Sequence, residues 1–105
     1  MNIHTIILAA GKGTRLKTNL PKVMQPLGGH TLISRVIKTA KTSSKKITVI
    51  VGHQKDQLKR HIASIDPSIQ TADQNEQLGT AHAVKMASHL IKDNEKVLVL
   101  YGDVP

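Results

Sequence analysis

The stretch Ile3-His4-Thr5-Ile6-Ile7-Leu8-Ala9-Ala10-Gly11-Lys12-Gly13-Thr14-Arg15 joins a short aliphatic run to a glycine-rich turn. A run of this length that ends at glycines is typical of a buried strand followed by a loop. The segment from Ala9 to His30 shows little periodicity, and a loop of that length in a compact domain is usually functional or disordered. Ligands bind at the carboxyl ends of strands in open α/β sheets, so the sequence predicts a ligand site in this loop.

Strand and helix patterns alternate along the rest of the chain. The predicted strands are Ile3–Leu8, Lys46–Val51, Pro67–Ala72 and Lys96–Leu100. The predicted helices are Thr31–Lys41, Gln54–Ala63 and Thr80–Ile91. The first, second and fourth strands are rich in Ile, Val and Leu and are expected to be buried on both faces. The strand pattern of Pro67–Ala72 is weaker. This alternation predicts an α/β, Rossmann-like fold with a mostly parallel sheet and helices on both faces.

Length and composition exclude several classes of protein. The chain has 105 residues, enough for one domain at most, and no cysteine, which excludes disulfides and thiolate metal sites. Tyr101 is the only aromatic residue, so there is no stacking platform for single-stranded nucleic acid. No apolar run reaches the ~18–20 residues of a membrane helix, and Ile6–Ala10 is too short for a signal peptide. We therefore expect a cytoplasmic protein without membrane insertion.

The charge predicts an anionic partner. The net charge is +8, from 15 Lys and Arg against 7 Asp and Glu. Nucleic acid, an anionic membrane surface and a phosphorylated small molecule all fit such an excess. The lysines on the predicted helices are either simply solvated or in contact with nucleic acid phosphates, but no nucleic-acid-binding motif accompanies them.

The glycine-rich loop has the chemistry of a phosphate site. Gly11 and Gly13 can adopt positive φ, which lets successive N–H groups point into one concavity. Lys12 and Arg15 add positive charge there, and Lys22 follows Pro21. Neither the dinucleotide fingerprint nor the Walker A loop matches these residues. The loop is thus either a nest for a polyphosphate or a surface turn with two unrelated cations.

Other polar residues follow the later strands and have two interpretations each. Asp103, after the fourth strand, is either a Mg²⁺ ligand or a residue of a strand-ending turn. Gln74 either reads a base with its amide or lies exposed in a loop. Thr80 has the residue type of a helix N-cap. The six histidines lack metal-ligand spacing; His82 and His89 share a predicted helix, and surface or packing roles are favoured.

Three motifs together resemble a known family. The strand with Leu-Ala-Ala-Gly-Lys-Gly-Thr-Arg and then Leu20-Pro21-Lys22 resembles sugar-phosphate nucleotidyltransferases of the GT-A-like type. Glu76-Gln77-Leu78-Gly79-Thr80-Ala81-His82-Ala83 and Tyr101-Gly102-Asp103-Val104-Pro105 narrow the resemblance to the uridyltransferase domain of the bifunctional bacterial GlmU family. The resemblance implies a GT-A-type nucleotidyltransferase fold, of which residues 1–105 would be the N-terminal portion of the pyrophosphorylase domain. It covers the whole chain.

The resemblance also implies a substrate site. The residues expected to contact nucleotide or sugar are Leu8, Ala9, Ala10, Gly11, Lys22, Gln74, Gly79, Thr80, Tyr101, Gly102 and Asp103. Among these, Gln74 would lie beside the uracil, and Asp103 would bind the Mg²⁺ cofactor. Arg15 and Lys22 would be the catalytic residues that stabilise charge on the phosphates.

The implied reaction transfers UMP from UTP to N-acetylglucosamine 1-phosphate, giving UDP-N-acetylglucosamine and pyrophosphate for peptidoglycan and lipopolysaccharide precursors. Two alternatives remain: a truncated nucleotide-binding fragment without turnover, and a basic nucleic-acid-binding protein. Family members continue past the Tyr-Gly-Asp motif and trimerise through a β-helix acetyltransferase domain, neither of which these 105 residues include. A sheet that stops after four strands leaves an open edge, so we expect the chain to be poorly stable or to associate.

Overall fold

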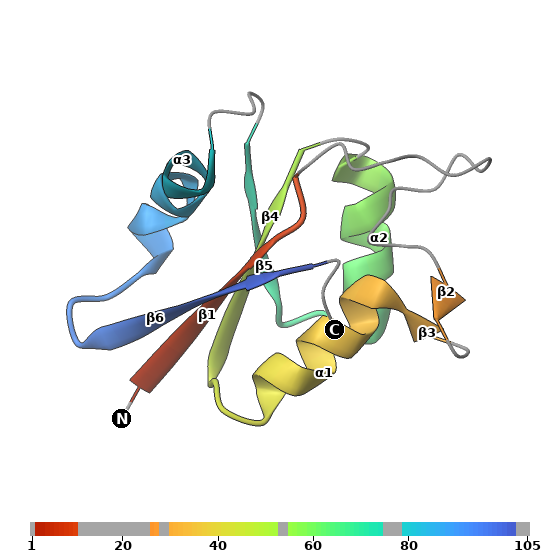
Figure 1. The fold of residues 1–105 in the computed structure, drawn as a ribbon, viewed down its shortest axis with the longest axis horizontal. Helices are drawn as coiled ribbons and strands as arrows, with labels where there is room; N and C mark the ends of the chain where they lie inside the picture. Colours follow the sequence, from red (N-terminus) through yellow and green to blue (C-terminus); the bar gives the residue numbers. More distant parts are fainter. Residues whose placement is uncertain (1, 11–25, 28–29, 53–54, 75–78, 103–105) are drawn as a thin grey trace.

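The computed structural model describes residues 2–10, 26–27, 30–52, 55–74 and 79–102 (Figure 1). Its main sheet has the order β5-β4-β1-β6, and each neighbouring pair is parallel. The strands are β1 (Asn2–Leu8), β4 (Lys46–Val51), β5 (Gln70–Asp73) and β6 (Glu95–Tyr101). The predicted α/β fold with a parallel sheet is therefore confirmed. Two short antiparallel strands that the sequence did not predict, β2 (Pro26–Leu27) and β3 (His30–Thr31), form a separate ribbon.

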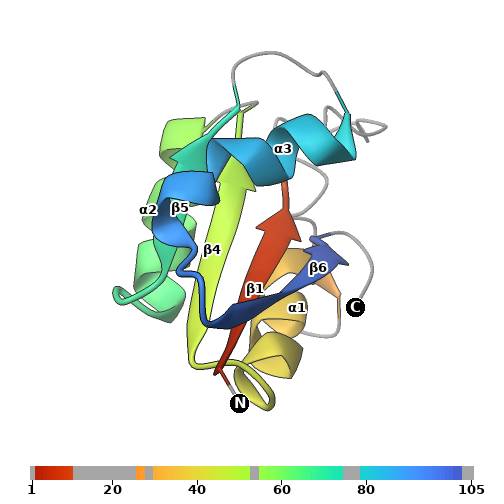
Figure 2. The ribbon, with the colours of Figure 1, turned by 90° about the vertical axis from the view of Figure 1, so that its left-hand side faces the viewer.

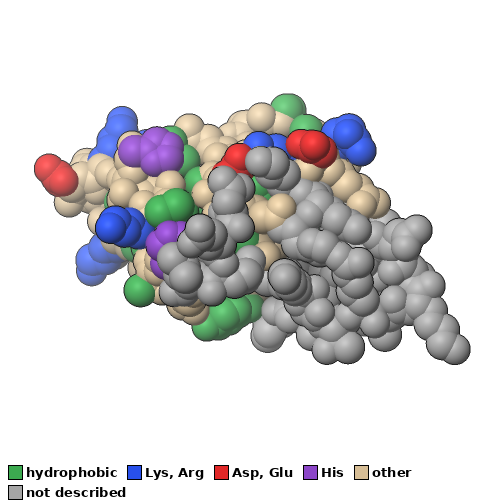
Figure 3. Space-filling view, turned by 90° about the horizontal axis from the view of Figure 1, so that it is seen from above, with side chains coloured by type: hydrophobic (Ala, Val, Ile, Leu, Met, Phe, Trp, Pro, Cys, Tyr) green, Lys and Arg blue, Asp and Glu red, His purple; other side chains and the backbone are tan. Residues whose placement is uncertain are grey.

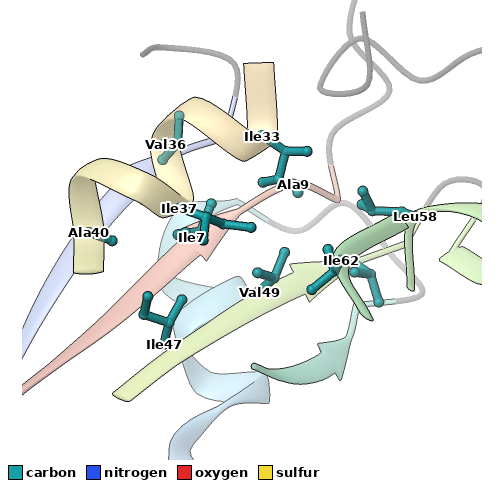
Figure 4. Close-up of a cluster of buried hydrophobic side chains, with 11 residues drawn as sticks. Ile7, Ala9, Ile33, Val36, Ile37, Ala40, Ile47, Val49, Leu58 and Ile62 are labelled. Carbon is teal, nitrogen blue, oxygen red and sulfur yellow. The ribbon is translucent and has the colours of Figure 1, made fainter. Parts of the chain in front are cut away.

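Helices cover both faces of the sheet, as the sequence predicts (Figures 1 and 2). The helices are α1 (Leu32–Lys41), α2 (Lys55–Ile65), α3 (Thr80–Met86) and the short 3₁₀ helix η2 (Ser88–Leu90). One core cluster joins α1 and α2 to one side of β1 and β4 (Figure 4). The other joins α3 to the opposite side of the sheet. Adjacent residues Ile6 and Ile7 lie in different clusters because side chains alternate along a strand.

Local hydrogen bonds set two element boundaries that the sequence placed differently. Helix α1 begins at Leu32 because Thr31 is its N-cap, with Thr31 Oγ1 accepting from the Ser34 N–H at 3.2 Å. Strand β5 does not begin at Pro67. Asp66 Oδ1 accepts from the Ser68 N–H at 2.9 Å, which closes a turn through the proline. The strand therefore starts only at Gln70.

The third predicted helix, Thr80–Ile91, is too long. Helix α3 ends at Met86, and Ala87 (φ −98°, ψ 1°) leaves the helical region. The hydrogen bonds from Ala87 N–H to Val84 O and from Leu90 N–H to Ala87 O both span three residues, which is 3₁₀ spacing. As a result, His82 lies in α3 and His89 in η2, so these two histidines do not share one helix.

Strand β6 is not buried on both faces as predicted. Val97 is 42% exposed and Leu98 39% exposed, although neighbouring side chains point to opposite faces. Among the described residues, β6 pairs only with β1 and is an edge of the sheet. The open edge expected from the sequence is therefore confirmed in the described part of the chain. In that same part, no helix is long and apolar enough to span a bilayer.

Candidate functional site

The parallel strands β1, β4 and β5 end at the same edge of the sheet (Figure 1), and Figure 3 shows the molecule from that side. Backbone hydrogen bonds continue the ladder past the strand ends. Ala9 N–H donates to Ile50 O at 3.0 Å, and Gln74 N–H donates to Val51 O at 2.8 Å. On the other side of β1, Gly102 N–H donates to Leu8 O at 2.9 Å. The segments that follow all four strands are thus held side by side at the edge where α/β sheets bind ligands.

Small residues make this edge compact. Ala9 and Ala10 are 5% and 2% exposed. Gly52 directly follows β4, and a Cβ there would lie 2.6 Å from the Gln74 carbonyl oxygen and 3.1 Å from Ala10 Cβ. Only glycine fits without displacing a neighbouring backbone. The predicted site residues Ala9 and Ala10 are thus buried at this edge, and Ala10 packs against Gly52.

Gln74 is buried, with an exposed fraction of 4%, so its interpretation as an exposed loop residue is wrong. Its amide nitrogen Nε2 lies 3.3 Å from the carbonyl oxygen of Gly79 and 2.9 Å from His82 Nδ1. These contacts fix the side chain at the carboxyl end of β5. A buried and oriented amide of this kind is suited to reading the hydrogen-bonding edge of a ligand.

Gly79 precedes α3 and has φ 98° and ψ 175°, a conformation that is essentially restricted to glycine. Gly79 is the N-cap of α3, and Thr80 is the first helical residue, so Thr80 is not the N-cap that its residue type suggested. The Thr80 hydroxyl Oγ1 lies 3.5 Å from the hydroxyl of Tyr101 at the end of β6. The motifs around Gly79 and Tyr101, far apart in sequence, therefore meet in space.

The described structure brings together Leu8, Ala9, Ala10, Gln74, Gly79, Thr80, Tyr101 and Gly102 at or beside one edge of the sheet. Tyr101 is 53% exposed there. The remaining predicted site residues lie outside the described residues: Gly11, Lys12, Arg15, Lys22 and Asp103. Within the described residues, no three His, Asp or Glu side chains gather as a metal site would require. The phosphate and metal parts of the prediction therefore stay predictions.

Two residues of this site were missed by sequence reasoning. Gly52 carried a signal, since it directly follows a predicted buried strand. Little in the sequence indicated a role for His82, because its contact with Gln74 depends on how α3 docks against the end of β5. One charged pair lies close by: Lys59 Nζ is 3.1 Å from Asp73 Oδ1, so the carboxylate just before Gln74 carries an ion pair.

Two other histidines have structural partners away from this edge. His4 is fully buried, with Nε2 2.7 Å from Thr48 Oγ1 and Nδ1 3.3 Å from Glu95 Oε1. His61 Nε2 lies 2.8 Å from Oγ1 of the N-cap Thr31, and partial burial lowers the pKa of His61. Both serve packing, as the absence of metal spacing predicts.

A parallel α/β sheet with small residues and an oriented amide at its strand ends is a frequent setting for ligand binding, and comparison with known proteins gives the class. Residues 5–105 match the model of the MobA-like NTP transferase domain, and the chain belongs to this family. The chain is also a homologue of the bifunctional protein GlmU.

The most informative relatives are much longer than this chain. It is 50% identical over 106 residues to the bifunctional protein GlmU of Burkholderia orbicola and 45% identical over 104 residues to that of Marinobacter nauticus. These matches span 100% and 98% of this chain but 22% of each relative. The chain therefore covers less than a quarter of the curated relatives.

Solved structures support the same fold. HddC from Yersinia pseudotuberculosis, complexed with GMP-PN, superposes with a TM-score of 0.81 at 28% identity, over 96% of this chain and 48% of that one. A nucleotidyl transferase from Methanothermobacter gives a TM-score of 0.83 at 18% identity, over 99% and 51%. The latter likeness concerns the fold alone. This chain spans about half of each solved chain.

Proposed function

We propose that this chain takes part in the transfer of UMP from UTP to N-acetylglucosamine 1-phosphate, which yields UDP-N-acetylglucosamine and pyrophosphate. The observation that carries the proposal is the joint placement of Gln74, Gly79 and Gly102 at the carboxyl edge of a parallel sheet. The 50% identity to a GlmU protein supports the choice of substrates. The donor nucleotide would lie over Leu8, Ala9, Ala10 and Gly11. Its base would lie beside Gln74, and Thr80 and Tyr101 would line the rest of the site.

Arg15 and Lys22 would stabilise the negative charge that develops on the α-phosphate and on the departing pyrophosphate. Two cations placed against those oxygens lower the barrier by electrostatic stabilisation. The attacking phosphate oxygen of the sugar phosphate is already ionised at neutral pH, so no general base is needed. Positioning of the two substrates supplies the rest of the rate enhancement.

Mg²⁺ fits the donor chemistry of this edge. Asp103 directly follows Gly102, whose N–H is held by the carbonyl of Leu8 at the end of β1. A carboxylate at a strand end is the ligand type that Mg²⁺ uses together with substrate phosphates. We propose that Asp103 holds the ion, which when bound would neutralise phosphate charge. The cytoplasmic location of the reaction is proposed from the same resemblance, which also implies that full-length family members trimerise through a further domain.

The second candidate is nucleotide binding without turnover. This candidate is favoured by the length of the match, because this chain spans only 48% of the HddC chain with which it superposes. Residues that complete the sugar pocket in longer relatives would then be needed for transfer. In this case the chain binds UTP and releases no pyrophosphate.

The test is pyrophosphate release from UTP, Mg²⁺ and N-acetylglucosamine 1-phosphate, with UTP binding measured in parallel. We expect Arg15→Ala and Lys22→Ala to reduce turnover by orders of magnitude. Lys38→Ala, on the exposed face of α1, is the matched control and should be unchanged. Binding without release favours the second candidate. Salt-sensitive DNA binding without UTP binding would reject both in favour of a nucleic-acid-binding protein.

A further inference from the structure

His82 and Gly79 together determine which way the amide of Gln74 faces. Gln74 Nε2 lies 3.3 Å from the Gly79 carbonyl oxygen, and a carbonyl can only accept a hydrogen bond. If the amide were flipped, two oxygens would face each other at this distance. The nitrogen must therefore point toward Gly79, which assigns the orientation from the chemistry of its neighbour.

His82 then takes the second N–H of the same amide. Nδ1 of His82 lies 2.9 Å from Gln74 Nε2, and a nitrogen that receives an N–H donor must carry a lone pair. This requires the tautomer of His82 with its proton on Nε2. A primary amide has two N–H donors, and Gly79 and His82 use both.

The amide of Gln74 is left with its oxygen, Oε1, as an acceptor. None of the described residues donates a hydrogen bond to it. We propose that His82 is a positioning residue that makes Gln74 a pure acceptor, and that this selects a base with an N–H on its pairing edge. Uracil carries such an N–H at N3, whereas cytosine presents a lone pair there. This inference rests on the proposed function, in which the base lies beside Gln74.

Selectivity follows from the cost of opposing two acceptors. Gln74 is 4% exposed, so water cannot easily relieve a mismatch between Oε1 and the ring nitrogen of cytosine. A site built to complete one hydrogen bond rejects an analogue that leaves the buried group unpaired. We expect uridine triphosphate to bind about 10- to 100-fold more tightly than cytidine triphosphate. Without His82, only the longer 3.3 Å hydrogen bond to Gly79 holds the amide, so the amide turns more easily and the preference for UTP over CTP should shrink.

The experiment measures the dissociation constants of UTP and CTP for the unmodified full chain and three variants. His82→Leu removes the acceptor, and we expect the CTP-to-UTP ratio to fall at least fivefold. His82→Asn places an amide oxygen near the position of Nδ1 and should preserve the ratio. His89→Leu, an exposed residue of η2, is the matched control and should not change it. A purely structural role of His82 would weaken both nucleotides equally, and an unchanged ratio in His82→Leu would overturn the proposal.

A second measurement tests the geometry without nucleotide. Nitrogen-15 NMR of the nucleotide-free chain should show His82 protonated on Nε2, with the Gln74 side-chain amide resonances shifted in His82→Leu and kept in His82→Asn. Protonation on Nδ1 instead would overturn the proposal directly. If the unmodified chain bound neither nucleotide, the proposed function would fail and base selection with it. Binding with an unaltered ratio would remove only the role of His82.

Discussion

The carbonyl oxygen of Gln74 occupies the space in which a side chain at Gly52 would have to lie: the two are so close that a Cβ would approach the oxygen to 2.6 Å. The neighbouring Ala10 would be contacted at 3.1 Å. Backbone rather than a flexible side chain lies in the way, so the ends of β4 and β5 must move apart to admit a methyl group. We therefore expect Gly52→Ala to lower the free energy of unfolding by about 1–3 kcal/mol.

Urea unfolding monitored by circular dichroism measures that loss. The same substitution should weaken UTP binding, because it displaces Gln74 from its position beside Gly79. Ser43→Ala, in the exposed turn after α1, is the control for a small change outside the site. A Gly52→Ala chain as stable as the unmodified one would show that the edge is looser than the packing indicates.

Gly79→Ala tests the cost of backbone strain rather than of a steric clash. A Cβ at Gly79 would meet nothing within 4 Å, but φ at this residue is 98°. The penalty is therefore backbone strain of about 1–3 kcal/mol rather than a clash. Because strain is relieved by rotating the peptide, we expect the Gly79 carbonyl to turn away from Gln74. The Gln74 amide resonances should then shift, a change that NMR detects, whereas equal stability and unshifted resonances would contradict this expectation.

Thr48→Val should be costly because it leaves His4 with an unsatisfied nitrogen. His4 and Thr48 are both fully buried, and His4 Nε2 lies 2.7 Å from Thr48 Oγ1. Valine keeps the shape and removes the partner, so we expect a loss of about 1–3 kcal/mol in unfolding free energy. Thr39→Val, exposed on α1, is the control.

The double variant His4→Leu/Thr48→Val completes this test by denaturant unfolding. It removes both polar partners, so it should lose less than the sum of the two single losses. Strict additivity would mean that the hydrogen bond contributes nothing specific.

Asp66 should contribute to the acid sensitivity of the fold. Hydrogen bonds from the Lys41 ammonium and from Ser68 hold the pKa of Asp66 well below its ordinary value of 3.8, and the Lys41 Nζ lies 2.6 Å from the carboxylate. A carboxyl group whose folded pKa is depressed adds stability above its unfolded pKa, and this stability is lost as the pH falls through the folded value. The pairing therefore stabilises at pH 6 and fades from about pH 4 downward.

Asp66→Asn should accordingly be less stable than the unmodified chain at pH 6, with a difference that narrows as the pH falls below 4. Urea unfolding at pH 6, 4 and 3 gives the comparison. The pKa of Glu95 is also lowered, chiefly by the Lys92 N–H, so the unmodified chain and Asp66→Asn share that second contribution. A difference that is constant with pH would contradict the assignment to Asp66.

Strand β6 should drive association of the 105-residue chain. Val97 and Leu98 expose apolar surface on opposite faces of an edge strand, which is a ready site for pairing between chains. We expect the double substitution Val97→Thr/Leu98→Thr to reduce association while preserving strand propensity. Sedimentation velocity over a range of concentrations measures this, with Ser43→Ala, in the exposed turn after α1, as the control. A monomeric unmodified chain at high concentration would refute the expectation.

The hydrophobic pattern of the sequence predicted the main strands and helices well, but it predicted the residues at which they begin and end less well. Strand β4 matches its predicted range because its residues are mostly β-branched and favour an extended backbone. The early end of α3 depends on how Ala87 packs against the sheet, which no periodicity in the sequence contains. The exposure of β6 was equally hidden, because an aliphatic run has the same pattern in the centre of a sheet and at its edge.

In the candidate site, too, some features were predictable from the sequence and others were not. The resemblance selected Ala10 and Gly102 as site residues, and their position at one edge follows from the parallel direction of the strands that they end. The contact of Gln74 with His82 was not predictable, because it depends on how α3 docks against the end of β5. Sequence reasoning thus anticipated that several predicted site residues lie together at one edge of the sheet, but not the polar contacts between them.

The position of β1 in the sheet has a consequence for how the chain is made. β1 lies between β4 and β6, with His4 paired to Lys46 and Asn2 paired to Glu95. On the ribosome, β1 therefore emerges before either neighbour exists, and one of its sides stays unpaired until residues beyond 95 leave the exit tunnel. Throughout that interval its amides and aliphatic side chains are open to chaperones and to other nascent chains. Slowing translation between α2 and β6 would lengthen that exposure without changing a single residue of the finished protein.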